Sequence, residues 1–124
     1  MVTTWFSIET SEGLATIYDT NITLNVVAMA QLGDAYGVKV GYDDNDSVVI
    51  MPLSKADVLR GDIDAKSVFL IKAHSSYMRI SSSLLVKMIA EHSHLSFSKT
   101  PQRFKTEYDG DAKILRIILK ERRD

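Results

Sequence analysis

Apolar and polar residues follow one another along the chain in an order that occurs twice. In the first copy, Ile22 and Leu24 share one face of a short strand, and residues 26–32 carry apolar side chains at helical spacing. Asn25 between them is a good N-cap, because its side-chain oxygen can accept a backbone N–H of the first turn. Gly33 is typical of a helix that ends in the left-handed conformation. The pattern therefore predicts a strand followed directly by a short helix.

A β-hairpin is predicted after this helix. Residues 38–42 alternate between apolar and polar or small side chains, and residues 48–51 form the returning strand. The run Asp43-Asp44-Asn45-Asp46 between them has turn chemistry, because Asp and Asn tolerate positive φ and bond to their own backbone. Pro52 has no N–H for a strand ladder and indicates an edge or a strand end.

A looser copy of the same order lies between residues 78 and 119. It comprises a strand at 77–80, a helix ending near His92, an insertion at 93–102, and a hairpin of residues 103–108 and 112–120 around Asp109-Gly110. Tyr42-Asp43 and Tyr108-Asp109 fall at equivalent places, which is the best single evidence for a repeat. The alternative is that any two segments with the order strand–helix–strand–strand would align this well.

The flanking segments complete the expected fold. Residues 5–8 and 14–18 read as an N-terminal hairpin, and residues 67–72 as a strand buried on both faces. Ser54 and Asp57 have the spacing of a capping box in the connector 54–66. We expect an α+β fold, mostly β, as one domain over residues 1–124, with units 1–53 and 67–120. Each βαββ unit is too small to bury its apolar face, so the two are expected to interleave their hairpins into a barrel-like domain.

Part of the first unit resembles a known family. The residues concerned are Ile22-Thr23-Leu24-Asn25, Leu32-Gly33, the strand 38–42, Asp43-Asp44, residues 48–50 and Pro52. Together they resemble the AbrB-type swapped-hairpin domain, which implies a DNA-binding transcription regulator or an antitoxin. The usual basic residues of that family are missing, since Thr20, Asn21, Val27 and Gln31 are neutral. Residues 79–89 also resemble, more vaguely, a segment of small Firmicute and phage proteins, without implied chemistry.

Composition places the chain among ordinary globular proteins. It has 124 residues, of which 45% are hydrophobic and 25% charged, and it has no cysteine for a disulfide or a thiolate metal site. No apolar stretch approaches the roughly 18 residues that span a bilayer. The N-terminal residues lack the basic region of a secretory signal. We therefore expect a cytoplasmic protein without a membrane partner.

The two halves of the chain differ in charge. Residues 1–62 contain three Lys or Arg and nine acids, a net of −6, whereas residues 63–124 contain twelve and seven, a net of +5. The sum is the formal net charge of −1. Such asymmetry fits a nucleic-acid face, an acidic protein partner or self-association of unlike halves, and it equally fits charges spread over a solvated surface.

Catalytic and metal-binding patterns are weak. His92 and His94 would need further ligands to hold a metal, and two exposed histidines after a helix end explain them as well. The acids 43–46 lack the spacing of a calcium loop. Serines 81–83 lie in no nucleophile motif and are better read as helix caps, and no phosphate-binding glycine pattern occurs. We expect no enzyme activity, no metal site and no cofactor.

Two functions remain from the sequence. The first is a DNA-binding protein that acts as a homodimer on double-stranded DNA through the basic second unit, with candidate contacts Lys72, His74, Arg79, Arg103, Lys105, Lys113, Arg116, Arg122 and Arg123. The alternative is a phage or mobile-element interaction module without DNA affinity, which binds a toxin or a host protein through the acidic residues Asp34, Asp43, Asp44 and Asp46. The neutral residues of the first unit favour the second reading, and the basic hairpin favours the first.

Overall fold

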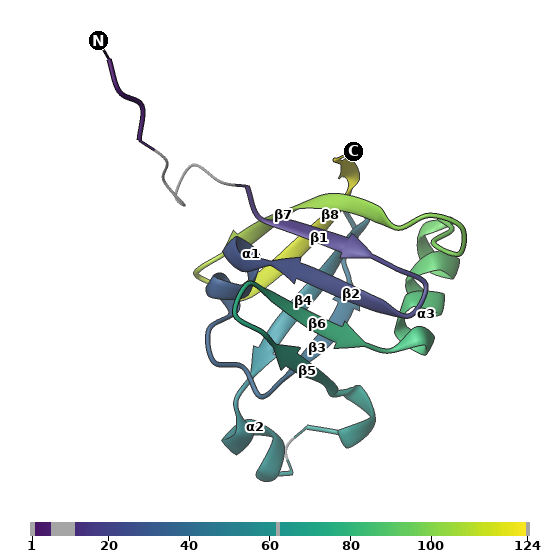
Figure 1. Ribbon diagram of the computed structural model, residues 1–124. Coiled ribbons are helices and arrows are strands. Elements are labelled where there is room, and N and C mark those ends of the chain that lie inside the picture. Colours follow the sequence, from purple (N-terminus) through teal and green to yellow (C-terminus); the bar gives the residue numbers. More distant parts are fainter. Residues whose placement is uncertain (1, 6–11, 62, 124) are drawn as a thin grey trace.

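The strands of the protein close into a single antiparallel barrel (Figure 1). The computed structural model describes residues 2–5, 12–61 and 63–123. Its elements in chain order are β1 (Leu14–Ile17), β2 (Asn21–Asn25), α1 (Val26–Leu32), β3 (Gly37–Tyr42), β4 (Ser47–Leu53), α2 (Lys55–Leu59), the 3-10 turn η2 (Ala65–Ser67), β5 (Phe69–Ala73), β6 (Tyr77–Ser81), α3 (Ser83–Ser93), β7 (Gln102–Asp109) and β8 (Ile114–Arg122). The expected class, α+β with mostly β and a barrel, is confirmed.

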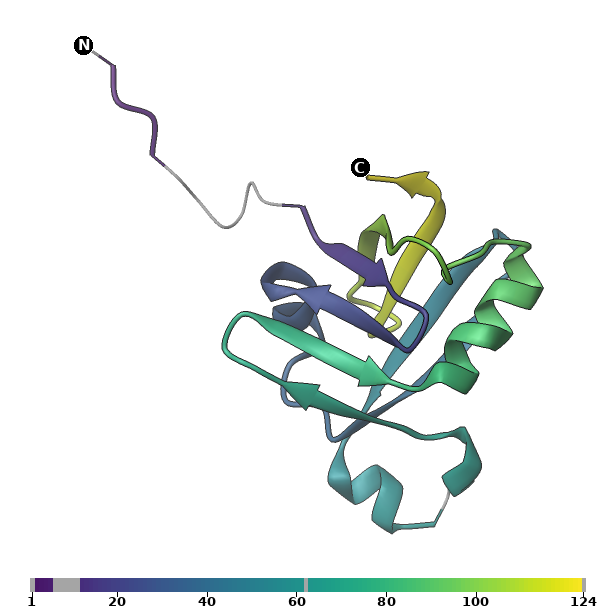
Figure 2. The same ribbon diagram turned by 45° about the vertical axis from the view of Figure 1, so that its right-hand side comes forward.

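The order of strands around the barrel is β1-β2-β6-β5-β3-β4-β8-β7. When β1, β2, β3 and β4 are exchanged with β5, β6, β7 and β8, respectively, strands that are neighbours around the barrel remain neighbours. The register between β2 and β6 has the same symmetry. Thr23 pairs with Arg79, and the flanking pairs are Ile22 with Ile80 and Leu24 with Met78. Figure 2 shows the resulting arrangement, in which the β1–β2 and β5–β6 hairpins lie side by side. The order strand–helix–strand–strand thus occurs in both halves, each preceded by one more strand.

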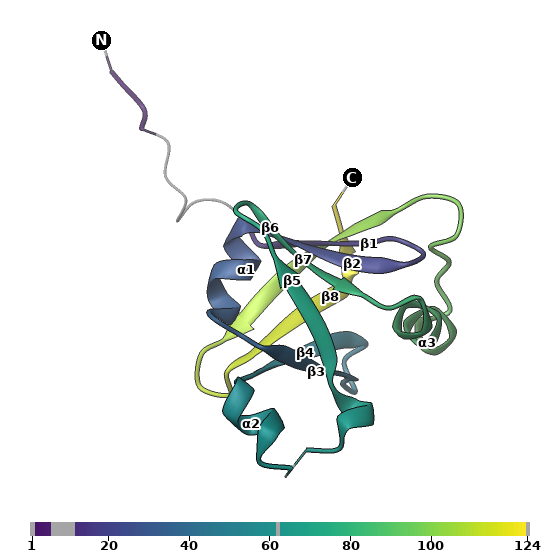
Figure 3. The same cartoon turned by 60° about the horizontal axis from the view of Figure 1, so that its bottom comes forward.

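The core is the interior of this barrel. Alternate residues of every strand point inward, as a period of two requires in a closed sheet, and the largest fully buried side chains are Phe104, Ile17, Ile22, Leu24, Ile50, Met78, Ile80, Leu115, Ile117, Val38 and Val48. Helices α1 and α3 lie at opposite ends of the barrel in all three views (Figure 3). Their buried residues Ala28, Leu32, Leu85, Val86 and Ile89 join the same core.

Local signals at the helix ends behave largely as the sequence predicts. Asn25 caps α1, since its Oδ1 accepts the N–H of Ala28 at 3.1 Å. Ser54 and Asp57 form the predicted capping box of α2. Gly33 has positive φ (67°), but its ψ of −148° lies outside the left-handed helical region, so the predicted helix end is wrong in this detail.

Two strand predictions need correction. Residues 14–18 were expected to pair with residues 5–8, but β1 pairs with β2 on one edge and with β7 on the other, which leaves no edge free. Residues 6–8 themselves lie outside the described residues. Strand β5 is not buried on both faces, because Leu70 is 64% exposed. An antiparallel barrel strand has one solvated face, whatever the apolar run in its sequence suggests.

The insertion 93–102 closes one end of the barrel. Helix α3 stops where His94 adopts the left-handed conformation and donates its N–H to the Ala90 carbonyl. Phe97 in the following loop is 4% exposed, and its ring meets Phe104 of β7 edge to face with 6.4 Å between centroids. The segment therefore extends the core and is not merely a surface loop.

Candidate nucleic-acid interface

A row of polar and basic side chains crosses the outer face of five neighbouring strands. The register places Lys72 opposite Arg79, Arg79 opposite Thr23, Thr23 opposite Thr16, and Thr16 opposite Arg103. Directly opposed residues project from the same face of a sheet. This face is the outer one, because the alternate residues of these strands are buried in the barrel. We call Lys72, Arg79, Thr23, Thr16 and Arg103 the basic row.

The surface along the basic row is hollowed. One depression of about 510 Å³ is lined by Thr16, Thr23, Arg79 and Arg103 together with Leu14, Tyr18, Asn25, Ser76 and Tyr77. A second, of about 440 Å³, is lined by Thr16, Tyr18, Thr100, Pro101, Arg103, Arg122 and Arg123. The two share the lining residues Thr16, Tyr18 and Arg103, so they are adjacent, and we call the pair of shallow depressions over β6, β2, β1 and β7 the channel.

Aromatic rings flank this channel. Tyr77 stacks on His74 with 4.4 Å between ring centroids and an interplanar angle of 21°. The Arg79 guanidinium lies 5.5 Å from the centroid of the same Tyr77 ring, within cation–π range. Tyr18, in the loop between β1 and β2, is 38% exposed. Neither tyrosine was among the residues predicted from the sequence, although Tyr77 precedes Arg79 by two positions and so shares its face of β6.

The three cations of the basic row keep their charges uncompensated. Over the described ranges of the chain, no carboxylate lies within ion-pair distance of Lys72, Arg79 or Arg103. Opposed residues on neighbouring strands are Thr or another cation, so the sheet itself brings no acid to them. The row is therefore a surface of concentrated positive charge on a protein whose net charge is only −1.

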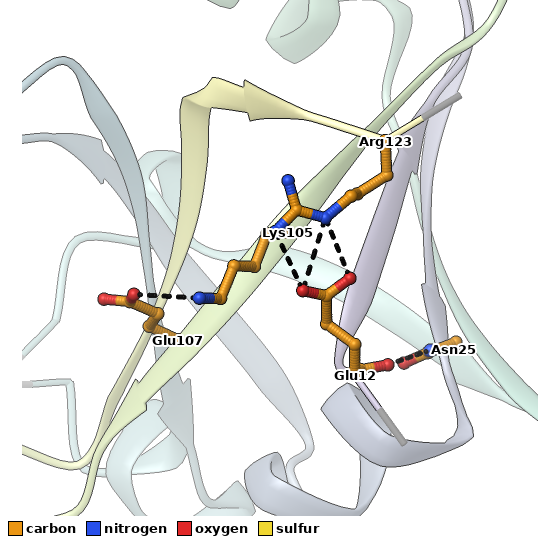
Figure 4. Close-up of polar contacts among 5 residues, drawn as sticks. All are labelled: Glu12, Asn25, Lys105, Glu107 and Arg123. Atoms are coloured by element: carbon orange, nitrogen blue, oxygen red, sulfur yellow. Dashed lines mark hydrogen bonds and ion pairs between the residues drawn. The ribbon is translucent and has the colours of Figure 1, made fainter. Parts of the chain in front are cut away.

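At the rim of the channel the predicted basic residues are paired (Figure 4). Arg123 donates to both carboxylate oxygens of Glu12, with Nη2–Oε1 and Nε–Oε2 distances of 3.0 Å. These hydrogen bonds lower the pKa of Glu12 and raise that of Arg123, and the attraction between the two charges acts in the same direction. Lys105 lies 3.6 Å from Glu107. The rim thus offers less free charge than the centre.

The remaining predicted contacts lie elsewhere. Arg116 on β8 is 3.3 Å from Asp43 and 3.5 Å from Asp109, so it ties together the two hairpin turns. Hydrogen bonds from Ala112 N–H and Asp111 N–H, with Arg116 adding to them, lower the pKa of Asp109. Lys113 has a φ of 57° in the β7–β8 turn. Of the nine predicted DNA contacts, the structure therefore gathers Lys72, His74, Arg79, Arg103, Lys105, Arg122 and Arg123 around the channel and leaves these two apart.

The acidic residues of the alternative hypothesis are partly committed to the fold. Asp43 Oδ1 accepts the N–H groups of Asn45 and Ser47 at 3.0 and 2.9 Å, as the turn prediction requires. Asp46 lies 3.7 Å from Lys120. Asp34 and Asp44 are exposed. The acids do not form one uncompensated surface comparable with the basic row.

In the part of the chain that the structure describes, no group of three or more His, Asp or Glu residues could hold a metal ion. His92 instead lies against Tyr42, with 3.9 Å between ring centroids. No helix among the described residues has both the length and the apolar character to cross a membrane. No family model, curated protein or solved structure matches the chain, so the resemblance to the AbrB-type domain stays a prediction.

Proposed function

We propose that this protein binds double-stranded DNA through the basic row and acts as a small transcription regulator or as an antitoxin. The observation that carries the proposal is the alignment of three uncompensated cations with two threonine hydroxyls across five strands. Lys and Arg neutralise phosphates, and the Thr16 hydroxyl can donate a hydrogen bond to a phosphate oxygen, whereas the Thr23 hydroxyl already donates to Asn21 Oδ1 at 3.0 Å. The resemblance of the first unit to the AbrB-type domain supports the same function.

The dimensions of the row suit a DNA groove. Arg79 and Arg103 are separated by three strand spacings, about 14 Å at roughly 4.8 Å per spacing. The major groove is about 12 Å wide, so the two arginines can contact phosphates on its opposite sides. Thr16 and Thr23 then lie between the two backbones. Lys72, one further strand away, adds a third phosphate contact on the Arg79 side.

Fluorescence anisotropy with a labelled mixed-sequence duplex tests the proposal at low salt. We expect binding, and we expect Arg79→Gln and Arg103→Gln each to weaken it several-fold because each removes one phosphate contact. Arg116→Gln is the matched control, since this arginine also lies on an outer strand face but is already paired with Asp43 and Asp109. Absence of binding at low salt, or equal losses in all three variants, would contradict the proposal.

A further inference from the structure

The seam between β3 and β5 is incompletely paired. Strand β3 pairs with β4 over its whole length, from Gly37 to Tyr42, but with β5 only at Gly37 and Val38. Beyond Val38, the described residues of β3 pair with β4 alone. Residues 39–42 therefore form an open strand edge, the kind of edge to which another strand can pair.

The backbone groups on this edge can be assigned. Asp43 N–H donates to the Ser47 carbonyl. In an antiparallel pair every second residue bonds to the same neighbouring strand, so every second residue before Asp43 in β3 also bonds to β4. Val40 and Tyr42 are the intervening residues, and their N–H and C=O groups point away from β4. Pro52 is consistent with this alternation, because it lies opposite Val38 and has no N–H to donate to β3. Two donors and two acceptors are thus presented along the open edge.

The open edge faces helix α3 across an apolar groove. The groove has a volume of about 160 Å³ and is lined by Val40, Gly41 and Tyr42 of β3 and by Leu85, Met88, Ile89 and His92 of α3. Met88 is 45% exposed, although its neighbours on this face of the helix are core residues. An open strand edge beside an apolar helix face is the arrangement that accepts an extended segment as an added strand.

The chain itself carries a segment suited to the groove. Residues 2–5 read Val-Thr-Thr-Trp, four residues with high β-propensity and no charge. They lie away from the barrel (Figure 1), with Val2 94% and Trp5 83% exposed. A tryptophan carries a large apolar area, so covering Trp5 with an apolar surface is favourable.

We propose that the groove between β3 and α3 receives residues 2–5 of a second copy of this chain as an added strand. The geometry favours a second copy over the same one, because the N-terminal segment enters the barrel beside α1, where Asn25 binds the Glu12 carbonyl. The groove is lined by residues of α3, and this helix lies at the other end of the barrel from α1 (Figure 3). Each copy donates one segment and accepts one, so a reciprocal exchange closes a two-fold dimer.

The single tryptophan of the chain, Trp5, reports directly on this exchange. We expect its fluorescence emission to shift to shorter wavelength as protein concentration rises, in parallel with a mass of twice 13.9 kDa by light scattering. Met88→Glu places a charge in the groove and should abolish both changes. Leu84→Glu is the matched control, because Leu84 is 67% exposed on the same helix and does not line the groove.

Each contrary outcome overturns the proposal in a different way. An emission spectrum that does not change with concentration shows that Trp5 enters no second copy. A shifted spectrum in a protein that stays monomeric shows that the segment docks on its own barrel. A dimer that survives both Met88→Glu and Trp5→Ala uses another surface, and equal loss in Met88→Glu and Leu84→Glu assigns the contact to α3 outside the groove.

Discussion

Gly13 and Thr106 provide the sharpest test of the barrel closure. Gly13 precedes β1, and its carbonyl accepts the N–H of Thr106 on β7 at 2.9 Å. A Cβ atom added at Gly13 would overlap with Thr106 Oγ1, and the backbone of Gly13 is not in the left-handed region. The cost of Gly13→Ala therefore comes from this contact and not from backbone strain.

The size of the effect follows from the packing. Thr106 is 6% exposed, and its Oγ1 has no hydrogen-bond partner in the described part of the protein. Overpacking of this kind costs about 1–3 kcal/mol, so Gly13→Ala should destabilise the fold by that amount. In a Thr106→Ala background the space is empty, and the same change should cost less than about 0.5 kcal/mol. The double-mutant cycle should thus give a coupling energy of about 1–3 kcal/mol.

Urea unfolding followed by far-ultraviolet circular dichroism measures all four free energies of unfolding. Thr106→Val supplies the control. This variant removes the unpaired hydroxyl but keeps the volume, so it should stabilise the protein by about 1 kcal/mol and yet not rescue Gly13→Ala. If the cost of Gly13→Ala is the same in the wild-type and Thr106→Ala backgrounds, the two residues do not touch, and the described closure between β1 and β7 is wrong.

Three further predictions concern caps, pH and salt. Asn25→Ala should cost more stability in urea unfolding than Ser54→Ala, about 2 kcal/mol against about 1, because Asn25 also accepts Leu14 N–H and donates to the Glu12 carbonyl. The pKa of Glu12 is lowered from 4.5 mainly by its hydrogen bonds with Arg123, so the pair stabilises the fold above that pH and not after Glu12 is protonated. Arg123→Gln should therefore be less stable than wild type at neutral pH, and the difference should shrink as the pH falls below 4.5 and vanish once Glu12 is protonated in the folded protein. For DNA binding, Arg79→Gln should reduce the slope of log K against log salt by about 0.9 in anisotropy titrations, and an unchanged slope would exclude this residue as a phosphate contact.

Much of the secondary structure is legible in the sequence because its signals are local. Asn25 caps α1 with its own neighbour Ala28, and Asp43 closes a turn with Asn45 and Ser47. Both interactions span at most four residues, so the residue types in order are enough to predict them. The prediction that residues 67–72 form a strand buried on both faces is wrong because burial is not a local property. Whether β5 is buried depends on what covers its outer face.

The candidate site shows the limit of local reasoning. The sequence predicted Lys72, Arg79 and Arg103 as DNA contacts on the basic second unit, but it grouped them with Arg116, which lies on another part of the barrel beside Asp43. Tyr18 was missed because the arginines that line the channel with it, Arg79 and Arg103, come from strands far away in the chain. Charge and residue type identify candidates, whereas their partners follow only from strand pairing.

The sequence by itself determined the hairpins β3–β4 and β7–β8, the helix N-caps and the alternation that gives most strands an inner face, because these depend on neighbours within a few residues. The tertiary structure alone decided that β2 pairs with β6 and β1 with β7, and hence that Thr16 and Thr23 of the first half lie between Arg79 and Arg103 of the second. The physical reason is register. Strands that are distant in the chain choose their pairing by the shared core that they enclose, and this choice fixes which outward side chains become neighbours.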